Sequence, residues 1–295
     1  MKWLVLTLGA ATAALVAAEP RLPIKDAVLW TPEAVSTRGY ESSPTFTPEG
    51  REMYFVGADQ SFRGFRILRS RCAHGQWSSP EPAPFAAPAP VIEADPFIAP
   101  DGRRAYFVST RHDPRNEDFD VYFVTRRADG SWGKPIRLPP PVNSTASELL
   151  PRLDGEGHLY FGSARPGGHG KSDIYRAVEA SPGRWQVENV GPPVSTAADE
   201  YEAEVSRNGR ALVVVADRGN GSHLYRFRQG PMGWKEVGLV PARRDVFQVG
   251  PLLSPKGERL LFAQAHGERS GEIFLVDLVV GTKESWPPMC LDRSG

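Results

Sequence analysis

The stretch that decides the fold is residues 93–102, Glu93-ADPFIAPD-Gly102, together with the apolar run Ala105-YF-Val108 that follows it. The same succession of a polar block, a glycine and an apolar run occurs four more times, in blocks that begin at Glu41, Glu148, Glu200 and Gln248. The start-to-start spacings are 52, 55, 52 and 48 residues. A fixed period near 50 residues is typical of repeat architectures, so the chain is predicted to contain five copies of one structural unit.

Each unit contains four short segments separated by turns. Aromatic and β-branched residues dominate the segments, and Gly, Pro, Asp and Asn dominate the turns, which indicates a meander of four antiparallel strands. Asp101-Gly102 and Asn208-Gly209 are typical of tight hairpins and join the first strand to the second. A lone sheet cannot bury both faces, so the units must pack on one another. We therefore predict an all-β fold, a β-propeller of four-stranded antiparallel blades.

Tryptophan marks the fourth segment of each unit, at Trp77, Trp132, Trp185, Trp234 and Trp286, and Trp30 fits the same place upstream of the first block. Five blocks favour five blades, and six remain an alternative if the termini form an extra sheet. By repeat phase, residues 27–37 are predicted to form the outer strand of the last blade, near Ile273 to Leu278. Pro287-Pro288 lack ladder donors, so residues 287–295 are expected to be peripheral, and their deletion less costly than deletion of residues 19–37.

Residues 1–18 have the pattern of a signal peptide, with Lys2, an apolar run from Trp3 to Val16 and the small pair Ala17-Ala18. An uncleaved anchor is the alternative, although the run is shorter than the ~20 residues of a membrane span. No later stretch reaches that length. We expect a periplasmic or secreted protein whose residues 19–295 form a single, monomeric propeller domain without a membrane span.

Charge and cysteine content narrow the function classes. The 295 residues include 35 basic and 35 acidic side chains, a balance that argues against nucleic-acid binding. Cys72 and Cys290 are the only two cysteines and lie at opposite ends of the chain. Because the first and last units of a closed ring are neighbours, a disulfide between them and two free buried thiols are both open alternatives.

The repeat also resembles a known family. Pro-x-x-x-Pro-Asp-Gly, then Tyr-Phe-Val-Ser-x-Arg, then Asp-x-Tyr, is similar to the TolB-like (PD40, WD40-like) propeller repeat, most clearly from Pro96 to Tyr122 and from Pro151 to Tyr175. The repeats cover residues 28–290. The resemblance implies a periplasmic or secreted propeller used for binding, with catalysis in only some relatives. The function it favours is a non-catalytic protein- or ligand-binding module.

Polar residues recur at two fixed positions of the repeat, which we call columns. One column begins the first strand of each unit, and the other follows the end of the second strand. The block-opening column is Glu41, Glu93, Glu148, Glu200 and Gln248, and the second is Asp59, Arg111, Arg165, Arg218 and His266. Antiparallel pairing brings the columns together, which predicts contacts of Glu93 with Arg111, Glu148 with Arg165, and Glu200 with Arg218. One interpretation is a set of structural ion pairs. The other is a charged rim at one mouth of the channel that binds a partner's loop or a polar or carbohydrate ligand.

The alternative function is a carbohydrate-active enzyme, a glycoside hydrolase or lyase that uses two channel-mouth carboxylates. Glu93-Ala-Asp95-Pro96 is similar to the Asp-Pro strand of five-bladed glycosidases, so Asp95 joins the candidate rim residues. Repetition of the glutamate in four blades favours an architectural role. We predict no catalytic residue, cofactor or metal site. The six histidines lack zinc-site spacing, and residues 116–120 lack the glycine and distal glutamate of a calcium loop.

Overall fold

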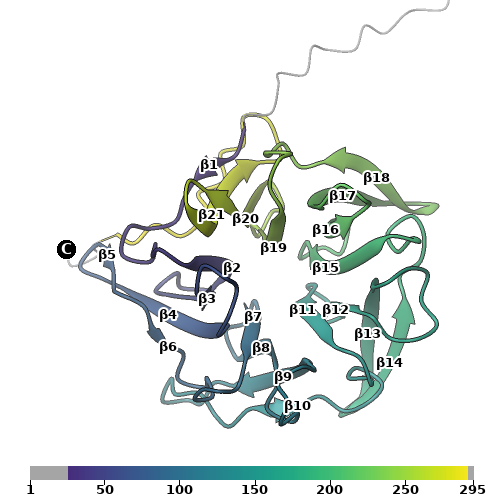
Figure 1. Ribbon diagram of the computed structural model, residues 1–295, viewed down its shortest axis with the longest axis horizontal. Helices are drawn as coiled ribbons and strands as arrows, with labels where there is room; N and C mark the ends of the chain where they lie inside the picture. Colours follow the sequence, from purple (N-terminus) through teal and green to yellow (C-terminus); the bar gives the residue numbers. More distant parts are fainter. Residues whose placement is uncertain (1–25, 292–295) are drawn as a thin grey trace, which may run out of the picture.

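The computed structural model describes residues 26–291, and Figure 1 shows the strands arranged as blades around a central axis. The predicted signal peptide lies outside the described residues. Residues 26–291 form strands and irregular segments, and they include no helix that could cross a membrane.

Each blade is an antiparallel meander that runs outward from the centre of the ring (Figure 1). The first blade consists of β2 (Tyr40–Phe46), β3 (Glu52–Ala58) and β4 (Arg66–Ala73), with β5 (Gln76–Trp77) and β6 (Glu81–Pro82) both paired to β4. The second consists of β7 (Glu93–Ile98), β8 (Arg104–Ser109), β9 (Asp120–Thr125) and β10 (Ile136–Arg137). The third consists of β11 (Glu148–Leu153), β12 (Leu159–Ser163), β13 (Asp173–Ser181) and β14 (Arg184–Asn189). The fourth consists of β15 (Asp199–Val205), β16 (Ala211–Asp217), β17 (Ser222–Gly230) and β18 (Gly233–Leu239).

The fifth blade is completed by the N-terminus. Its strands are β19 (Gln248–Leu253), β20 (Arg259–His266), β21 (Arg269–Asp277) and, at the outer edge, β1 (Val28–Leu29). Val28 pairs with Leu275 and Leu29 with Phe274, and the Trp30 amide donates to the Ile273 carbonyl at 2.9 Å. Five blades, with the N-terminal segment as the outer strand of the last one, are therefore confirmed.

The C-terminal segment is fastened across the junction of the last and first blades. Cys72 in β4 and Cys290 form a disulfide that spans 218 residues of sequence. Trp286 lies outside the strands and is buried against Leu252 and Phe46. The expectation that the segment is peripheral is therefore wrong for its described part, residues 287–291, because Pro287 is buried and Cys290 is cross-linked to β4. A cross-link that closes so long a loop typically contributes about 2–5 kcal/mol.

The hydrophobic core lies between neighbouring blades. Phe107 and Trp132 of the second blade pack against Tyr54 of the first, and the Trp132 indole donates to the Tyr54 hydroxyl at 2.9 Å. A second interface buries Tyr106 of the second blade with Phe161 of the third. Each sheet thus buries its two faces on its neighbours, which fixes the innermost strands around the channel.

Candidate functional site

The block-opening glutamates lie inside the blades. Glu41, Glu93, Glu148 and Glu200 are each at most 1% exposed, so none projects freely into solvent. Thr37 donates to Glu41, and Thr196 donates to Glu200 through its hydroxyl and its amide, at 2.5 and 2.9 Å. Burial raises the pKa of Glu41 and of Glu148, and the hydroxyls that donate to them, of Thr37 and of Ser144, oppose the increase. The geometry favours loop bracing, and ligand binding by this rim stays a prediction.

Two of the predicted ion pairs are present. Arg165 Nη2 lies 2.9 Å from Glu148 Oε1, and Arg111 Nη2 lies 2.5 Å from Glu93 Oε1. Each guanidinium also donates to loop carbonyls, Arg111 to that of Phe85 and Arg165 to those of Pro141 and Val142. The pairs therefore tie each innermost strand to the loop that enters its blade.

The third predicted pair, Glu200 with Arg218, is wrong. Arg218 instead bonds Glu236 at 3.0 Å and lies 3.8 Å from the Tyr225 ring centroid. The loop after β16 is short, and the Asp217 carboxylate holds it tight by accepting two amides, which directs Arg218 toward the outer strand.

The remaining members of the second column also have local partners. Asp59 pairs with Arg63, and the His266 ring packs edge-on against Phe274. Asp59 and His266 therefore brace their own turns and strands. Gln248, of the block-opening column, accepts instead from the Leu224 amide of the neighbouring fourth blade at 3.4 Å.

A β-bulge interrupts every innermost strand at the channel wall. In four blades the bulge carries a positive φ, at Ser43, Asp95, Leu150 and Gly250. In each of these blades the next residue is proline, which has no amide to donate to the ladder. The fourth blade has Ala203 there, and it keeps its ladder partner Val214. Proline thus accounts for the longer gap in the ladder of these four strands.

Asp95 links three blades at this bulge. Its Oδ1 accepts from the Ser43 hydroxyl at 3.0 Å, and its Oδ2 accepts from the Leu150 amide at 3.1 Å. On the other side of Ser43, Gly250 approaches so closely that a Cβ there would lie 2.6 Å from the Ser43 nitrogen. Asp95 of the candidate rim is therefore an inter-blade connector with both oxygens engaged.

Three charged residues complete the set of contacts between blades at these bulges. Arg152 Nε lies 2.8 Å from Glu204 Oε2, and Glu204 Oε1 accepts from the Leu253 amide at 3.1 Å. Glu202 Oε2 accepts from the Gly250 amide at 2.7 Å. We call this set the channel belt: Ser43, Asp95, Leu150, Arg152, Glu202, Glu204 and Gly250.

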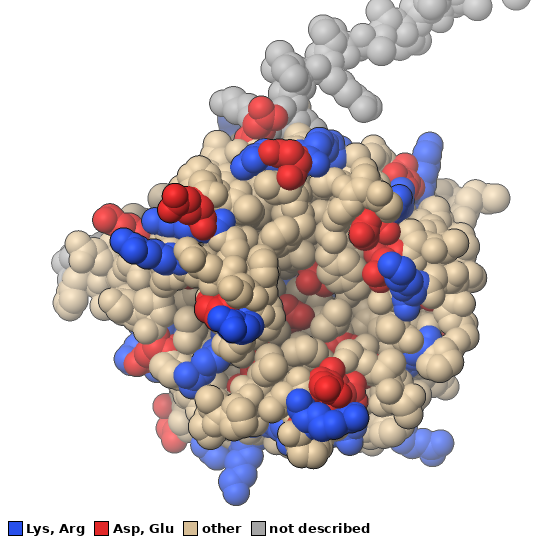
Figure 2. Space-filling model, in the orientation of Figure 1, with Lys and Arg blue, Asp and Glu red and all other residues tan. Residues whose placement is uncertain are grey.

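The belt places three carboxyl groups around one guanidinium. Burial, with a further increase from the charge of Asp95, raises the pKa of Glu202 to about 8. Burial raises the pKa of Glu204 to about 7 and also raises that of Asp95, and Arg152 opposes both shifts. Figure 2 shows the hollow at the centre of one face, with acidic atoms in its depth.

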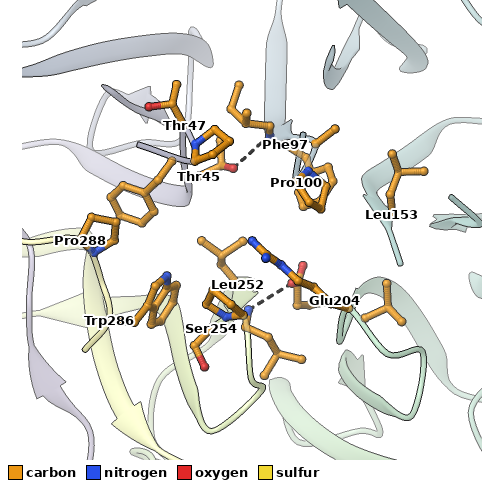
Figure 3. Close-up of a pocket in the computed structure, with 18 residues that line it drawn as sticks. Thr45, Thr47, Phe97, Pro100, Leu153, Glu204, Leu252, Ser254, Trp286 and Pro288 are labelled. Atoms are coloured by element: carbon orange, nitrogen blue, oxygen red, sulfur yellow. Dashed lines mark hydrogen bonds between the residues drawn. The ribbon is translucent and has the colours of Figure 1, made fainter. Parts of the chain in front are cut away.

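A recess of about 130 Å³ opens on the opposite face, among the turns between first and second strands. The blades run in opposite senses in Figures 1 and 3, so the two views are from opposite faces. Figure 3 shows Phe97, Leu252, Trp286 and Pro288 around the recess, with Glu204 of the belt at its side. The C-terminal segment thus supplies one wall, held there by the disulfide and by a bond from Arg259 to the Trp286 carbonyl.

Solved structures share this fold. TolB from Acinetobacter baumannii matches with a TM-score of 0.52 and 16% identity over 83% of this chain and 56% of that one. A putative TolB from Agrobacterium tumefaciens gives 0.51 and 17% over 79% and 72%. Penicillium chrysogenum alpha-L-arabinanase, complexed with arabinobiose, gives 0.50 and 13% over 81% and 77%. At these identities the similarity shows the β-propeller fold alone.

The chain spans little more than half the length of the first of these TolB structures. No family model and no curated protein matches its sequence. The PD40 assignment within the propeller fold therefore stays a prediction.

Proposed function

We propose that the protein is an exported, non-catalytic binding module, and that it docks an apolar or aromatic side chain of a partner protein in the recess beside the channel belt. The observation that carries the proposal is the recess itself. At about 130 Å³ it is smaller than most small-molecule pockets and suits one side chain. A single anchor in a desolvated pocket is how a few residues come to dominate protein interfaces.

The recess is also rigid. Its walls include Pro100 and Pro288, the aromatic ring of Phe97 and the indole of Trp286, side chains with few rotatable bonds. Little conformational entropy is lost when such walls meet a ligand, which favours affinity. The C-terminal wall is covalently held by Cys290.

Export is supported by three observations. The disulfide Cys72–Cys290 is of a kind that persists in oxidising compartments such as the periplasm. Residues 1–18 have the charge and apolar pattern of a signal peptide. The TolB-like resemblance implies the same location.

The carbohydrate-active alternative receives less support from the geometry. Its candidate carboxylates Glu93 and Asp95 are buried, and donors already engage both oxygens of each. We therefore place the function in the recess instead of among the rim carboxylates.

Site-specific photocrosslinking tests the proposal. A photoreactive phenylalanine analogue at Pro100, on the exposed edge of the recess, is expected to give a discrete protein adduct in the cell envelope of the native host. The matched control is Met232, which is 99% exposed on a hairpin outside the recess. Equal adducts from the two positions, or none from Pro100, would contradict docking at the recess. Turnover of glycan substrates would contradict the non-catalytic assignment.

A further inference from the structure

Three potential metal ligands of the second blade converge near the rim. His112 and Asp118 lie in the loop between β8 and β9, and Asp120 begins β9. His112 Nε2 lies 3.2 Å from Asp118 Oδ2 and 2.9 Å from Asp120 Oδ2. We propose that these three side chains bind a divalent first-row transition metal ion, represented by Zn²⁺, independently of the recess.

Asp120 has a buried oxygen that is available to a further ligand. Asp120 is fully buried, and within residues 26–291 its Oδ1 has no hydrogen-bond partner. Arg137 donates to the other oxygen, Oδ2. A buried polar atom without a partner is costly and rare. A cation bound at Oδ1 satisfies it while Arg137 keeps its own bond.

The donor set selects the metal class. One imidazole nitrogen and two carboxylates suit Zn²⁺ and its neighbours, whereas Ca²⁺ takes six to eight oxygens. Tetrahedral Zn²⁺ ligands stand about 3.3 Å apart, given metal–ligand bonds near 2.0 Å. His112 Nε2 lies 3.2 Å from Asp118 Oδ2, which is close to that value, and one donor atom of each of the three side chains lies within 4.8 Å of those of the other two.

Outer hydrogen bonds already orient the two carboxylates. Ser147 donates to Asp118 Oδ1 at 3.2 Å, and Arg137 donates to Asp120. Such contacts hold metal ligands in place in proteins. The side chains of His112 and Asp118 are 19% and 30% exposed. The ion therefore retains an open coordination position for water or for an acidic group of a ligand.

The third blade shows what the same fold looks like without this arrangement. Asp173 occupies the place of Asp120, and its Oδ1 is likewise buried without a partner in the described residues, but the His169 amide and the Asn189 side chain bond its Oδ2 instead of an imidazole. The imidazole, and not the unpartnered oxygen, therefore distinguishes the second blade. His158, at the opposite end of this blade from Asp173, does contact Asp154 at 2.8 Å. However, Arg176 Nη2 stands 3.0 and 3.1 Å from the two His158 ring nitrogens and takes the place of a cation.

Titration calorimetry of the purified mature protein with Zn²⁺ tests the inference, supported by the visible absorption of bound Co²⁺. One equivalent is expected to bind, and His112→Ala is expected to weaken binding at least tenfold. His158→Ala, the matched control, is expected to bind like wild type. Ca²⁺ is expected to give no saturable heat.

Binding to His112→Ala equal to that of wild type, loss of binding in His158→Ala, or tighter binding of Ca²⁺ than of Zn²⁺ would overturn the inference, as would no stoichiometric Zn²⁺ binding. His112 lies on a partly exposed loop, so its variant should keep the wild-type melting temperature. If it does not fold, Asp118→Asn is the substitute, because that side chain keeps its size and its bond to Ser147.

Discussion

The rim and the channel belt are built from the same repeat block, but rim residues bond within one blade and belt residues bond between blades. At the rim, Glu93 and Glu148 bond partners within their own blade and its entry loop, and the pattern recurs. In the belt, two to four residues further along, Arg152 and Glu204 bond between blades, and each occurs once. Repeated residues build the blade, and the residues that break the repeat connect blades.

This contrast explains why the belt is the more sensitive region. A rim carboxylate has several donors, so the loss of one leaves others in place. Arg152 is the only guanidinium in the belt, and it is fully buried among three carboxyl groups. Removing one partner of a buried ion pair leaves an uncompensated charge, which costs far more than loss of an exposed pair.

The largest effect is therefore expected for Arg152→Met, which keeps much of the apolar stem and removes the charge. We expect the free energy of unfolding to fall by about 3–5 kcal/mol at pH 8, measured by chemical denaturation. At pH 5 the loss should be smaller, because protonated carboxyl groups need no counter-ion. The double variant with Glu204→Gln should recover part of the stability. A smaller loss of unfolding free energy than that of Arg165→Met would contradict the claim that the belt is more sensitive than the rim.

A second, intermediate effect is the pH dependence of stability. The folded-state pKa values of Glu202 and Glu204, about 8 and about 7, lie above the ordinary value of 4.5. Their contribution to stability is thus full below pH 4.5 and is lost as the pH rises toward 8. We expect the Tm to fall as the pH is raised from 5 to 8.5.

Glu202→Gln sharpens this test, because the amide keeps the size and the acceptor for the Gly250 amide but does not titrate. Its Tm should change less over the same pH interval than that of wild type. Glu49→Gln, at an exposed turn, is the control and should follow wild type. A Glu202→Gln profile parallel to that of wild type would show that the belt carboxyls do not govern the pH dependence.

The features that could be predicted from the sequence are those set by the repeat. The block spacing gave the blades, the phase of Trp30 gave the closing strand β1, and the two columns gave the pairs of Arg111 and Arg165. The failure at Arg218 has a local cause, because a loop tightened by Asp217 changes the direction of a side chain that repeat position alone does not encode.

The contacts of the channel belt could not be predicted from a single repeat unit, because they form only in the closed propeller. Arg152 and Glu204 lie in different units, and only closure of the propeller brings them together. A signal was nevertheless present, since the fifth residue of the block is Thr45, Phe97, Arg152, Glu204 and Leu252 in the five units. A charge that appears at an otherwise uncharged repeat position indicates a specific partner. The His112 cluster has no such signal, because it depends on the conformation of one loop.

The smallest effect is expected at the rim, where Arg165→Gln and Arg218→Gln form a matched pair. Arg165 bonds a fully buried carboxylate and two loop carbonyls, so its loss should cost about 1–2 kcal/mol in the free energy of unfolding. Arg218 pairs with a partly exposed Glu236, and such pairs are worth about 0–1 kcal/mol. Urea denaturation of both variants measures the difference. Because Ser144 and Ser163 still donate to Glu148, even Arg165→Gln should remain less damaging than Arg152→Met. Equal costs for the two rim variants would mean that pairing with the buried glutamate adds no stability.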